Sequence, residues 1–308
     1  MDKQLLAQKR VLIVGDSMLD KYWFGDANRI SPEAPVPVVR IVRSEERLGG
    51  AANVALNVAS LGVQTTLMGV VGADENGTKL TELLTESGIH SHMIADPAIK
   101  TILKLRIVAR QQQLVRIDFD DHPSGEMLAS LLTDFAEVID NFDVLVLSDY
   151  GKGGLDHIRG MIDIAREKNI PVLVDPKGED YDKYVGATII TPNRAELTQV
   201  IGSWTSEEDL THRAQALRDR LGLKALLLTR SEEGMTLFTA EGAETVPAQA
   251  REVFDVSGAG DTVIAVTAAM IAAGVPLSEA VRIANRAGGI VVGKLGTASV
   301  SYNELFGN

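Results

Sequence analysis

The chain has 308 residues, a formal net charge of −12 and a hydrophobic content of 45%. These values are typical of a globular protein with a large core, built as one large domain or two smaller ones. The acidic balance excludes a general binder of nucleic acid or membrane surfaces, although a local basic pocket would still hold an anionic ligand. The chain has no cysteine, which excludes disulfides, thiolate chemistry and cysteine-based metal sites.

The N-terminal segment gives no sign of export. Residues 1–10 are polar, and they are too short for a signal peptide. A run of about 18 apolar residues, the length that a membrane span requires, does not occur. We therefore expect a cytoplasmic protein that binds neither membranes nor nucleic acid.

The first predicted strand, residues 11–15, is a continuous apolar run that ends in glycine. Such a run indicates a buried parallel strand with functional residues at its carboxyl end. Asp16 and Asp20 follow at that edge, where one of them could instead cap a turn. Residues 22–24 and 36–42 are aromatic and β-branched with prolines nearby, which predicts a small peripheral sheet.

Two glycines, Gly49 and Gly50, open an alanine-rich helix that continues to about residue 61. Paired glycines let the backbone approach a ligand closely, and Asn53 lies one turn into the helix on the same side. A buried strand at 65–71 and a helix at 76–87 follow. Glycine pairs before helices are common, so this signal alone is moderate.

Residues 91–119 predict three more short strands, at 91–95, 101–109 and 113–119. In the second, even spacings would place Lys104, Arg106 and Arg110 on one face. In an acidic chain, three cations on one face are a candidate site for a phosphate group. The three cations are explained equally well by an exposed edge strand whose charged side chains prevent pairing with another chain. We expect one α/β domain over residues 1–308, with a small β insertion, a lid, from about 22–43 and 91–119.

From residue 143 strands and helices alternate regularly, and each strand ends in polar or small residues, as the ligand-binding edges of open parallel sheets do. The expected strands are 144–147, 172–174, 188–190 and 225–229, followed by a hairpin at 234–239 and 244–247. The expected helices are 155–168, 194–200, 206–221, 259–273 and 278–294.

The segment from Asp255 to Thr262 carries the strongest chemical signal. Gly258, Ala259 and Gly260 have almost no side chains, and the helix that begins there points free N–H groups at one spot. Asp261 stands at the mouth of this predicted anion hole, where it could take a proton from a hydroxyl. An anion hole beside a base suits phosphoryl transfer to an alcohol. The alternative is an aspartate that caps a helix after a glycine turn.

Asn193 and Glu196 stand where a predicted strand passes into a helix. Glu196 could orient water around Mg²⁺, and Asn193 could reach a phosphate oxygen. The same spacing is also that of a capping pair at a helix start.

The segment 255–262 resembles, residue for residue, the C-terminal signature of the ribokinase-like carbohydrate kinases, the PfkB family. The resemblance implies an open, mostly parallel sheet flanked by helices with a small β-sheet lid. It also implies that Asp261 is the catalytic base and that residues 258–260 hold the transferred phosphate. The resemblance further implies that Gly49, Gly50 and Asn53 bind sugar hydroxyls, and that Asn193 and Glu196 bind magnesium and the nucleotide. It implies that Thr229, Gly234 and Asn285 bind ATP. It also implies a site for a monovalent cation, K⁺, formed by Asp255, Ser257 and carbonyl groups of residues 293–299.

Several longer segments look like the heptose 7-phosphate kinases of that family, among them residues 15–23, 29–38, 175–178, 229–235 and 292–297. This resemblance implies transfer of the ATP γ-phosphate to the anomeric hydroxyl of D-glycero-β-D-manno-heptose 7-phosphate, on the route to the ADP-heptose of lipopolysaccharide. Asp20, with Asp16, would hold sugar hydroxyls. The candidates for the 7-phosphate are Lys104, Arg106, Arg110, Lys152 and Lys177.

The resemblance further implies a homodimer that forms through the lid. In many relatives an adenylyltransferase domain is fused to the kinase, and we expect none within these 308 residues. Two alternatives stay open. One is another sugar or sugar-phosphate kinase of the family, acting for example on ribose, fructose or fructose phosphate. The other is a sugar-binding regulator on the same fold without catalytic activity.

Overall fold

The computed structural model describes residues 1–110, 112–249, 253–294 and 296–307. Within these residues, nine strands form a central sheet in the order β13-β12-β11-β10-β9-β8-β1-β4-β5. Neighbouring strands from β5 to β11 run parallel, and β12 and β13 add an antiparallel edge. The strands are β1 (Arg10–Gly15), β4 (Gln64–Gly72), β5 (His90–Asp96), β8 (Val144–Ser148), β9 (Val172–Asp175), β10 (Ile189–Ile190), β11 (Ala225–Thr229), β12 (Met235–Thr239) and β13 (Gly242–Val246).

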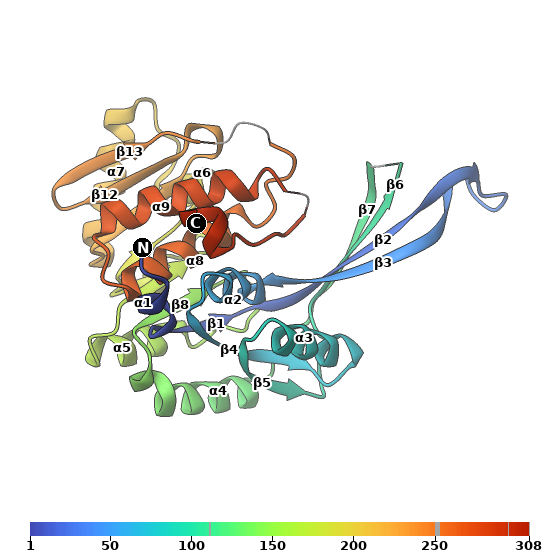
Figure 1. Cartoon of the computed structure of the whole chain (residues 1–308), viewed down its shortest axis with the longest axis horizontal. Coiled ribbons are helices and arrows are strands. Elements are labelled where there is room, and N and C mark those ends of the chain that lie inside the picture. Colours follow the sequence, from blue (N-terminus) through green and yellow to red (C-terminus); the bar gives the residue numbers. More distant parts are fainter. Residues whose placement is uncertain (111, 250–252, 295, 308) are drawn as a thin grey trace.

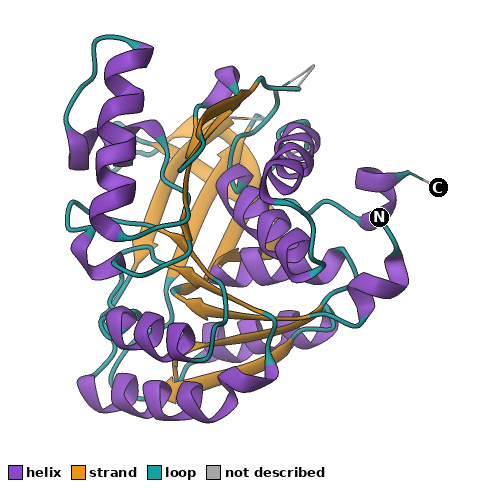
Figure 2. Ribbon diagram, turned by 90° about the vertical axis from the view of Figure 1, so that its left-hand side faces the viewer, coloured by secondary structure: helices purple, strands orange, loops and turns teal. Residues whose placement is uncertain are grey.

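Helices cover both faces of this sheet (Figure 2). The side chains of β1 explain why: Val11 and Ile13 belong to the core on one face, and Leu12 and Val14 belong to the core on the other. A strand that is buried on both faces must be apolar at every position. One core contains residues of α2 (Ala51–Ser60), α3 (Glu75–Glu86), α8 (Ala259–Ala272) and α9 (Leu277–Val291), and the other contains residues of α4 (Gly125–Val138), α5 (Ile158–Glu167), α6 (Arg194–Ile201) and α7 (Glu207–Leu221).

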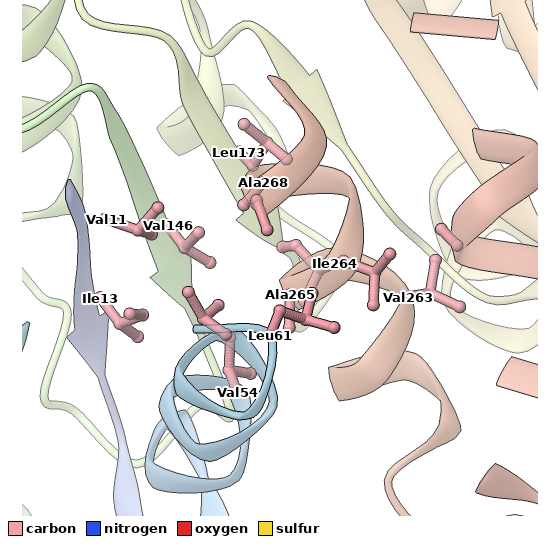
Figure 3. Packing of buried hydrophobic residues seen from close by; sticks show 14 of the residues in the cluster. Val11, Ile13, Val54, Leu61, Val146, Leu173, Val263, Ile264, Ala265 and Ala268 are labelled. Carbon is pink, nitrogen blue, oxygen red and sulfur yellow. The ribbon is translucent and has the colours of Figure 1, made fainter. Parts of the chain in front are cut away.

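The helices α2 and α8 pack against each other and against β1 and β8 (Figure 3). Small buried residues such as Ala55, Ala265 and Ala268 line these helices. Small side chains let helix backbones approach closely, so the first turns of α2 and α8 come together at the carboxyl edge of the sheet. That edge is where ligands bind in open α/β sheets.

A second sheet of four strands, in the order β3-β2-β6-β7, extends from the body as a long arm (Figure 1). We call this sheet the lid. Its strands are β2 (Ser17–Ile30), β3 (Pro37–Gly50), β6 (Leu103–Ala109) and β7 (Gln112–Phe119). A single residue, Asp16, separates β2 from the sheet strand β1, so the lid grows directly out of the carboxyl edge.

The structure corrects the expected extent of the lid. Residues 91–95 belong to β5, which pairs in parallel with β4 in the main sheet. β5 is an edge strand whose side chains are mostly exposed or half-exposed, so its pattern resembles that of the lid strands. The lid also begins earlier than residue 22 and ends later than residue 43, because both long strands continue down to the body.

Three helices were not anticipated from the sequence: α1 (Lys3–Ala7), α4 and α10 (Tyr302–Phe306). α4 is amphipathic and buries Leu128, Leu131 and Phe135, after a serine cap at Ser124 whose hydroxyl accepts the Met127 N–H at 3.5 Å. In the described ranges no helix combines the length and the apolarity that crossing a bilayer requires.

Candidate active site

Asp261 lies in the first turn of α8 and is only 5% exposed. One carboxylate oxygen accepts a hydrogen bond from Nδ2 of Asn53 at 2.7 Å, and the other accepts one from the hydroxyl of Tyr150 at 2.5 Å. Asn53 comes from the first turn of α2, and Tyr150 follows the end of β8. Three elements therefore fix the orientation of this carboxylate.

Burial raises the pKa of Asp261 above the ordinary value of 3.8. The hydrogen bonds from Asn53 and Tyr150 favour the ionised form and oppose that rise, while the negative charge of Asp20 adds to it. The pKa of Tyr150 is raised well above 10.0, first by burial and then by the charge of Asp261. The tyrosine therefore stays protonated and acts as a hydrogen-bond donor.

The glycine turn before α8 has a steric cause. Gly258 has φ +78°, and a Cβ added there would lie 2.8 Å from Nδ2 of Asn53. A Cβ at Gly260 would meet no protein atom within 4 Å, so the space in front of the helix is open. Glycine at these positions therefore allows the close approach of α2 and leaves room for a ligand.

The expected anion hole needs one refinement. The N–H of Ala259 donates to the carbonyl of Val256 at 3.2 Å, so Ala259 contributes its small size and not a free donor. Across the described ranges, no acceptor is found for the N–H groups of Gly258, Gly260 and Asp261. Free donors at a helix N-terminus bind anions.

A second polar layer, missed from the sequence, lies behind the base. Nδ2 of Asn57 donates to the Asn53 carbonyl at 3.0 Å, and the hydroxyl of Thr262 donates to Oδ1 of Asn57 at 3.1 Å. Asn57 is one helical turn after Asn53, and Thr262 directly follows the base, so both spacings could have indicated them. Tyr150 was also missed, although it lies in the polar run that follows β8.

Asp16 supports the site indirectly. Its carboxylate accepts N–H groups of Tyr150 at 2.9 Å, Lys152 at 3.0 Å and Gly154 at 2.9 Å, and the residue is 3% exposed. Burial raises its pKa, and the three N–H donors oppose that rise. Asp16 therefore holds the loop that carries Tyr150, in addition to its expected place near a sugar.

Asp20 lies at the base of the lid and is 3% exposed. Its Oδ1 accepts a hydrogen bond from Arg106 of β6 at 2.6 Å. A Cβ at Gly49 would lie 2.6 Å from Oδ2 of Asp20, and one at Gly50, where φ is +58°, would lie 2.4 Å from the Asp16 carbonyl. The glycine pair is thus required for β3 to meet β2 beside these two aspartates.

Four of the five predicted phosphate-binding cations lie near the sheet edge or the base of the lid. Nζ of Lys104 lies 5.5 Å from the ring centroid of Tyr150, Lys152 pairs with Asp120, and Lys177 pairs with Glu196 at 2.9 Å. The expectation for Arg110 does not agree with the structure. β6 ends at Ala109, its register shifts after Ile107, and Arg110 donates to Asn28 at 3.0 Å.

On the nucleotide side, Asn193 and Glu196 form a capping box at the start of α6, with reciprocal hydrogen bonds of 2.9 and 3.0 Å. The capping alternative is therefore realised. Thr229 pairs with Asn193 through a single β-bridge, and its N–H donates to the Pro192 carbonyl at 3.0 Å. These residues come together at the carboxyl ends of β10 and β11.

Gly234 and Asn285 shape this side of the sheet through backbone contacts. Gly234 has φ +91°, and a Cβ there would lie 2.1 Å from the Val246 carbonyl oxygen. Asn285 is 4% exposed and donates to the Pro247 carbonyl at 2.7 Å. A Cβ on Gly288 would lie 3.6 Å from Val263, an ordinary contact distance, so helix packing alone does not require glycine there.

Asp175, Glu196 and Asp261 form a group of acidic residues that suits a hydrated magnesium ion. Burial raises the pKa of Asp175, at the end of β9, well above 3.8, and the charges of Asp261 and Glu196 raise it further. Within the described ranges, no cluster of three or more His, Cys, Asp or Glu could hold a metal alone. Mg²⁺ does not require such a cluster, because it keeps several waters and binds one or two carboxylates plus phosphates. Asp175 was not among the predicted ligands.

Asp255 connects the segment that leads into the predicted anion hole with the loop after α9. Its carboxylate accepts the N–H groups of Ser257 at 2.9 Å and Gly296 at 3.0 Å. Burial acts to raise the pKa of Asp255, but these donors outweigh it and the pKa is lowered. The expected cation site also includes residue 295, which lies outside the described residues.

The chain is similar to known sugar kinases over nearly all of its length. Residues 8–304 match the family described as pfkB family carbohydrate kinase. The D-beta-D-heptose 7-phosphate kinase of Bordetella bronchiseptica is 55% identical over 98% of this chain and 96% of its own. The bifunctional protein HldE of Methylococcus capsulatus is 54% identical over 96% of this chain, which spans 63% of that protein.

A solved structure agrees with the fold. Phosphofructokinase-2 from Escherichia coli, in complex with substrates and products, aligns with a TM-score of 0.82 at 20% identity, over 96% of this chain and 97% of its own. The ribokinase-like fold expected from the sequence is therefore confirmed. The match over residues 8–304 shows that the chain belongs to the pfkB family of carbohydrate kinases.

Proposed function

We propose that this kinase transfers the γ-phosphate of ATP to the C1 hydroxyl of D-glycero-β-D-manno-heptose 7-phosphate. The product is the 1,7-bisphosphate, a precursor of the ADP-heptose in the lipopolysaccharide core. The observation that carries the chemistry is the buried Asp261 carboxylate, held by Asn53 and Tyr150 beside free N–H groups of α8. The choice of sugar follows the 55% identity to a protein named for that substrate.

In the proposed reaction, Asp261 takes the proton of the C1 hydroxyl as its oxygen bonds to the γ-phosphorus. The bond from that phosphorus to the leaving oxygen of ADP breaks, and the proton leaves later to solvent. A raised pKa makes the carboxylate a stronger base toward an alcohol, because general base catalysis improves as the two pKa values approach each other. Asn53 and Tyr150 keep both carboxylate oxygens oriented.

Negative charge on the transferred phosphoryl group would meet the N–H groups of Gly258, Gly260 and Asp261. The positive end of the α8 dipole adds to these donors. The arrangement is fixed before the substrate arrives, and this lowers the cost of reorganisation during transfer.

Glu196, through water, and Asp175 would hold Mg²⁺, with Asn193 near the nucleotide phosphates. The ion, when bound, supplies positive charge to those phosphates. Thr229, Gly234 and Asn285 would border the nucleotide. The carboxylate of Asp255, with Ser257, is the candidate for a K⁺ site. ATP is an intracellular donor, so the reaction implies a cytoplasmic protein.

Asp20, Gly49, Gly50 and Asn53 would contact the sugar, because they surround the approach to Asp261 at the base of the lid. The lid would close over the sugar and exclude water, which protects the phosphoryl group from hydrolysis.

We also propose a homodimer that forms through the lid. One lid face carries the exposed side chains of Val115, Ile117 and Phe119, which are 44%, 39% and 41% exposed. They lie opposite Ile107, Leu105 and Leu103 of β6, and the two leucines are already buried within the chain, so the exposed apolar surface lies mainly on β7. Exposed apolar surfaces of this kind mark protein interfaces. A second copy, which offers the same surface, fits this face.

A substrate panel tests the activity. ADP release is measured with heptose 7-phosphate, unphosphorylated heptose, ribose, fructose and fructose 6-phosphate at equal concentrations. We expect kcat/KM to be highest for heptose 7-phosphate. A higher value for another sugar would support the other kinases of the family, and no turnover with any sugar would support a regulator.

A further inference from the structure

The base of the lid contacts the loop after α9 at Gly296. This glycine has φ +71°, and a Cβ added there would lie 3.1 Å from Cζ of Arg47 and 3.3 Å from the hydroxyl of Tyr22. Tyr22 comes from β2 and Arg47 from β3, both from the part of the lid near the body. The guanidinium of Arg47 therefore occupies the space that a side chain at position 296 would need.

Two lid neighbours hold Arg47 in this place. Its Cζ lies 4.9 Å from the centroid of the Tyr22 ring, and one terminal nitrogen donates to Glu45 at 2.9 Å. Tyr22 pairs directly with Glu45 across β2 and β3, and Arg47 is two positions along β3, so the three side chains share one face of the lid. A guanidinium that is both stacked on a ring and paired with a carboxylate keeps little freedom, so its contact with the loop is a firm one.

This face of the lid also borders the active site. Arg106 of β6 pairs directly with Tyr22, and its Cζ lies 5.1 Å from the centroid of the Tyr22 ring. The Arg106 guanidinium binds Asp20 at 2.6 Å. Tyr22 itself is only 8% exposed. Its ring therefore contacts both the arginine that holds Asp20 and the arginine that reaches Gly296.

From Gly296 the contacts continue to the start of α8. The N–H of Gly296 donates to one carboxylate oxygen of Asp255 at 3.0 Å, and the other oxygen accepts the N–H of Ser257 at 2.9 Å. The next residue of the loop, Thr297, lies against the glycine turn, because a Cβ at Gly258 would be 3.6 Å from its methyl carbon. The position of Gly296 thus affects the segment that leads into α8, and with it the free N–H groups there.

Gly296 needs support from outside its own loop. A glycine at positive φ has no Cβ to restrict it, and it has access to more backbone conformations than any other residue. The Arg47 guanidinium packs beside it and limits that freedom. Donors stabilise a transferred phosphoryl group best when they are fixed before the group arrives. Whatever fixes Gly296 therefore also helps to preorganise the N–H groups of α8.

We propose that Arg47 is a positioning residue for phosphoryl transfer. It holds Gly296 in place and, through Asp255, fixes the free N–H groups at the start of α8. In this role it acts through the loop after α9 and not by binding the substrate. The inference rests on the proposed function, because it assumes that those N–H groups meet the transferred phosphoryl group.

Arg47→Gln tests this role, with Arg43→Gln as the matched control. Arg43 lies on the same strand, stacks on Phe24 at 4.0 Å and also pairs with Glu45. With the best sugar of the substrate panel, Arg47→Gln should lower kcat by about 10-fold, which is less than the 10²- to 10³-fold of a removed donor. The KM for sugar and for ATP should stay within about twofold, and the control should change neither constant. An unchanged kcat, or a rise in KM for the sugar alone, would overturn the inference.

A double-mutant cycle with Gly296→Ala tests the path of the effect. The added methyl group should displace the Arg47 guanidinium, so Arg47→Gln should lower kcat by about 10-fold in the wild type but by less than about twofold in the Gly296→Ala background. Equal factors in the two backgrounds would show that the residues act independently, and this result would also overturn the inference.

Hydrogen exchange supplies a measurement that is independent of the substrate. In Arg47→Gln, amide protection should fall in the peptides that contain Ser257 and Gly296 and stay unchanged in β8. A loss of protection throughout the protein, or none at 257 and 296, would contradict the role. If the wild type prefers another sugar while exchange and kcat respond as expected, the positioning role stands and the proposed substrate fails. If no sugar is phosphorylated, the proposed function and the catalytic role fail together.

Discussion

Nδ2 of Asn53 lies 2.7 Å from a carboxylate oxygen of Asp261, although 208 positions separate the two residues in the chain. The contact joins the first turn of α2 to the first turn of α8. Because small residues such as Ala55 and Ala265 let these helices pack closely, the geometry of the base depends on the core beneath it. The first predictions concern this contact.

Replacing Asp261 with asparagine should abolish most of the catalysis. The variant keeps the shape of the side chain but cannot accept the hydroxyl proton, so kcat should fall by about 10²- to 10⁴-fold. ADP release measures the loss, and calorimetry should show that ATP still binds. Asp163→Asn, at an exposed carboxylate that pairs with Arg159, is the matched control and should retain turnover. Near-normal turnover of Asp261→Asn would refute its role as the base.

Removing either donor to Asp261 should move the acid limb of the pH–rate profile to higher pH. The hydrogen bonds from Asn53 and Tyr150 lower the pKa of Asp261, so Asn53→Ala or Tyr150→Phe should raise it. The base must be ionised to act, and a higher pKa therefore means lost activity at acidic pH and recovery as the pH rises. The measurement is kcat/KM against pH. A limb that stays in place, or that moves to lower pH, would contradict the arrangement.

Alanine at Gly258 should cost more than alanine at Gly274, although both glycines have φ +78°. A Cβ at Gly274 meets nothing within 4 Å, so this variant carries only the backbone penalty of roughly 1–2 kcal/mol. At Gly258 the Cβ would also press on Asn53 at 2.8 Å. We expect Gly258→Ala to lose kcat and to melt lower than Gly274→Ala. Equal melting temperatures and full activity would show that the turn is not under this constraint.

Gly260→Ala tests the open space in front of α8. Its Cβ would meet no protein atom within 4 Å, so the fold should melt at nearly the wild-type temperature. If a phosphoryl group lies against this turn, the methyl group should still lower kcat/KM. A variant with wild-type kinetics would place the phosphate elsewhere.

Asp175→Asn should stabilise the protein without magnesium at neutral pH. The folded-state pKa of Asp175 lies well above 3.8, its value in an unfolded chain, so its ionised form destabilises the fold. That destabilisation is complete above the folded pKa and disappears as the pH falls below the unfolded value. Urea unfolding should therefore show a gain at neutral pH that shrinks toward pH 3.8. The same variant should need more Mg²⁺ for turnover. A loss of stability at neutral pH would show that the carboxylate contributes contacts that outweigh its repulsion.

Ile117→Glu should convert the proposed dimer into a monomer, because it buries a charge in the apolar lid face. Gln113→Glu, at an exposed and already polar position of the same strand, is the control. Light scattering after size exclusion measures the mass of each. A wild-type monomer, or a dimer that survives Ile117→Glu, would show that this face is not the interface.

Local patterns made much of this structure predictable. The strand at residues 11–15 and the anion-hole segment at 255–262 are short runs whose composition allows few structures. The errors concern contacts between distant elements. Residues 91–95 carry no sign of which sheet they join, and the register shift in β6 that displaces Arg110 is set by its pairing with β7. Tyr150 becomes part of the site only when the segment after β8 is placed beside α8.

The one-residue junction at Asp16 has a mechanical consequence. Only Asp16 lies between β1 and β2, so this link is too short to allow free rotation. Three backbone N–H groups also hold the Asp16 side chain in place. The lid would therefore bend along its length and would not rotate as a rigid unit about Asp16. Asp20 and Lys104 pair directly across β2 and β6, so both lie close to the fixed end and travel little as the arm bends. Bending would therefore move the tip of the arm most, and the polar groups at its base would keep a nearly constant distance from Asp261.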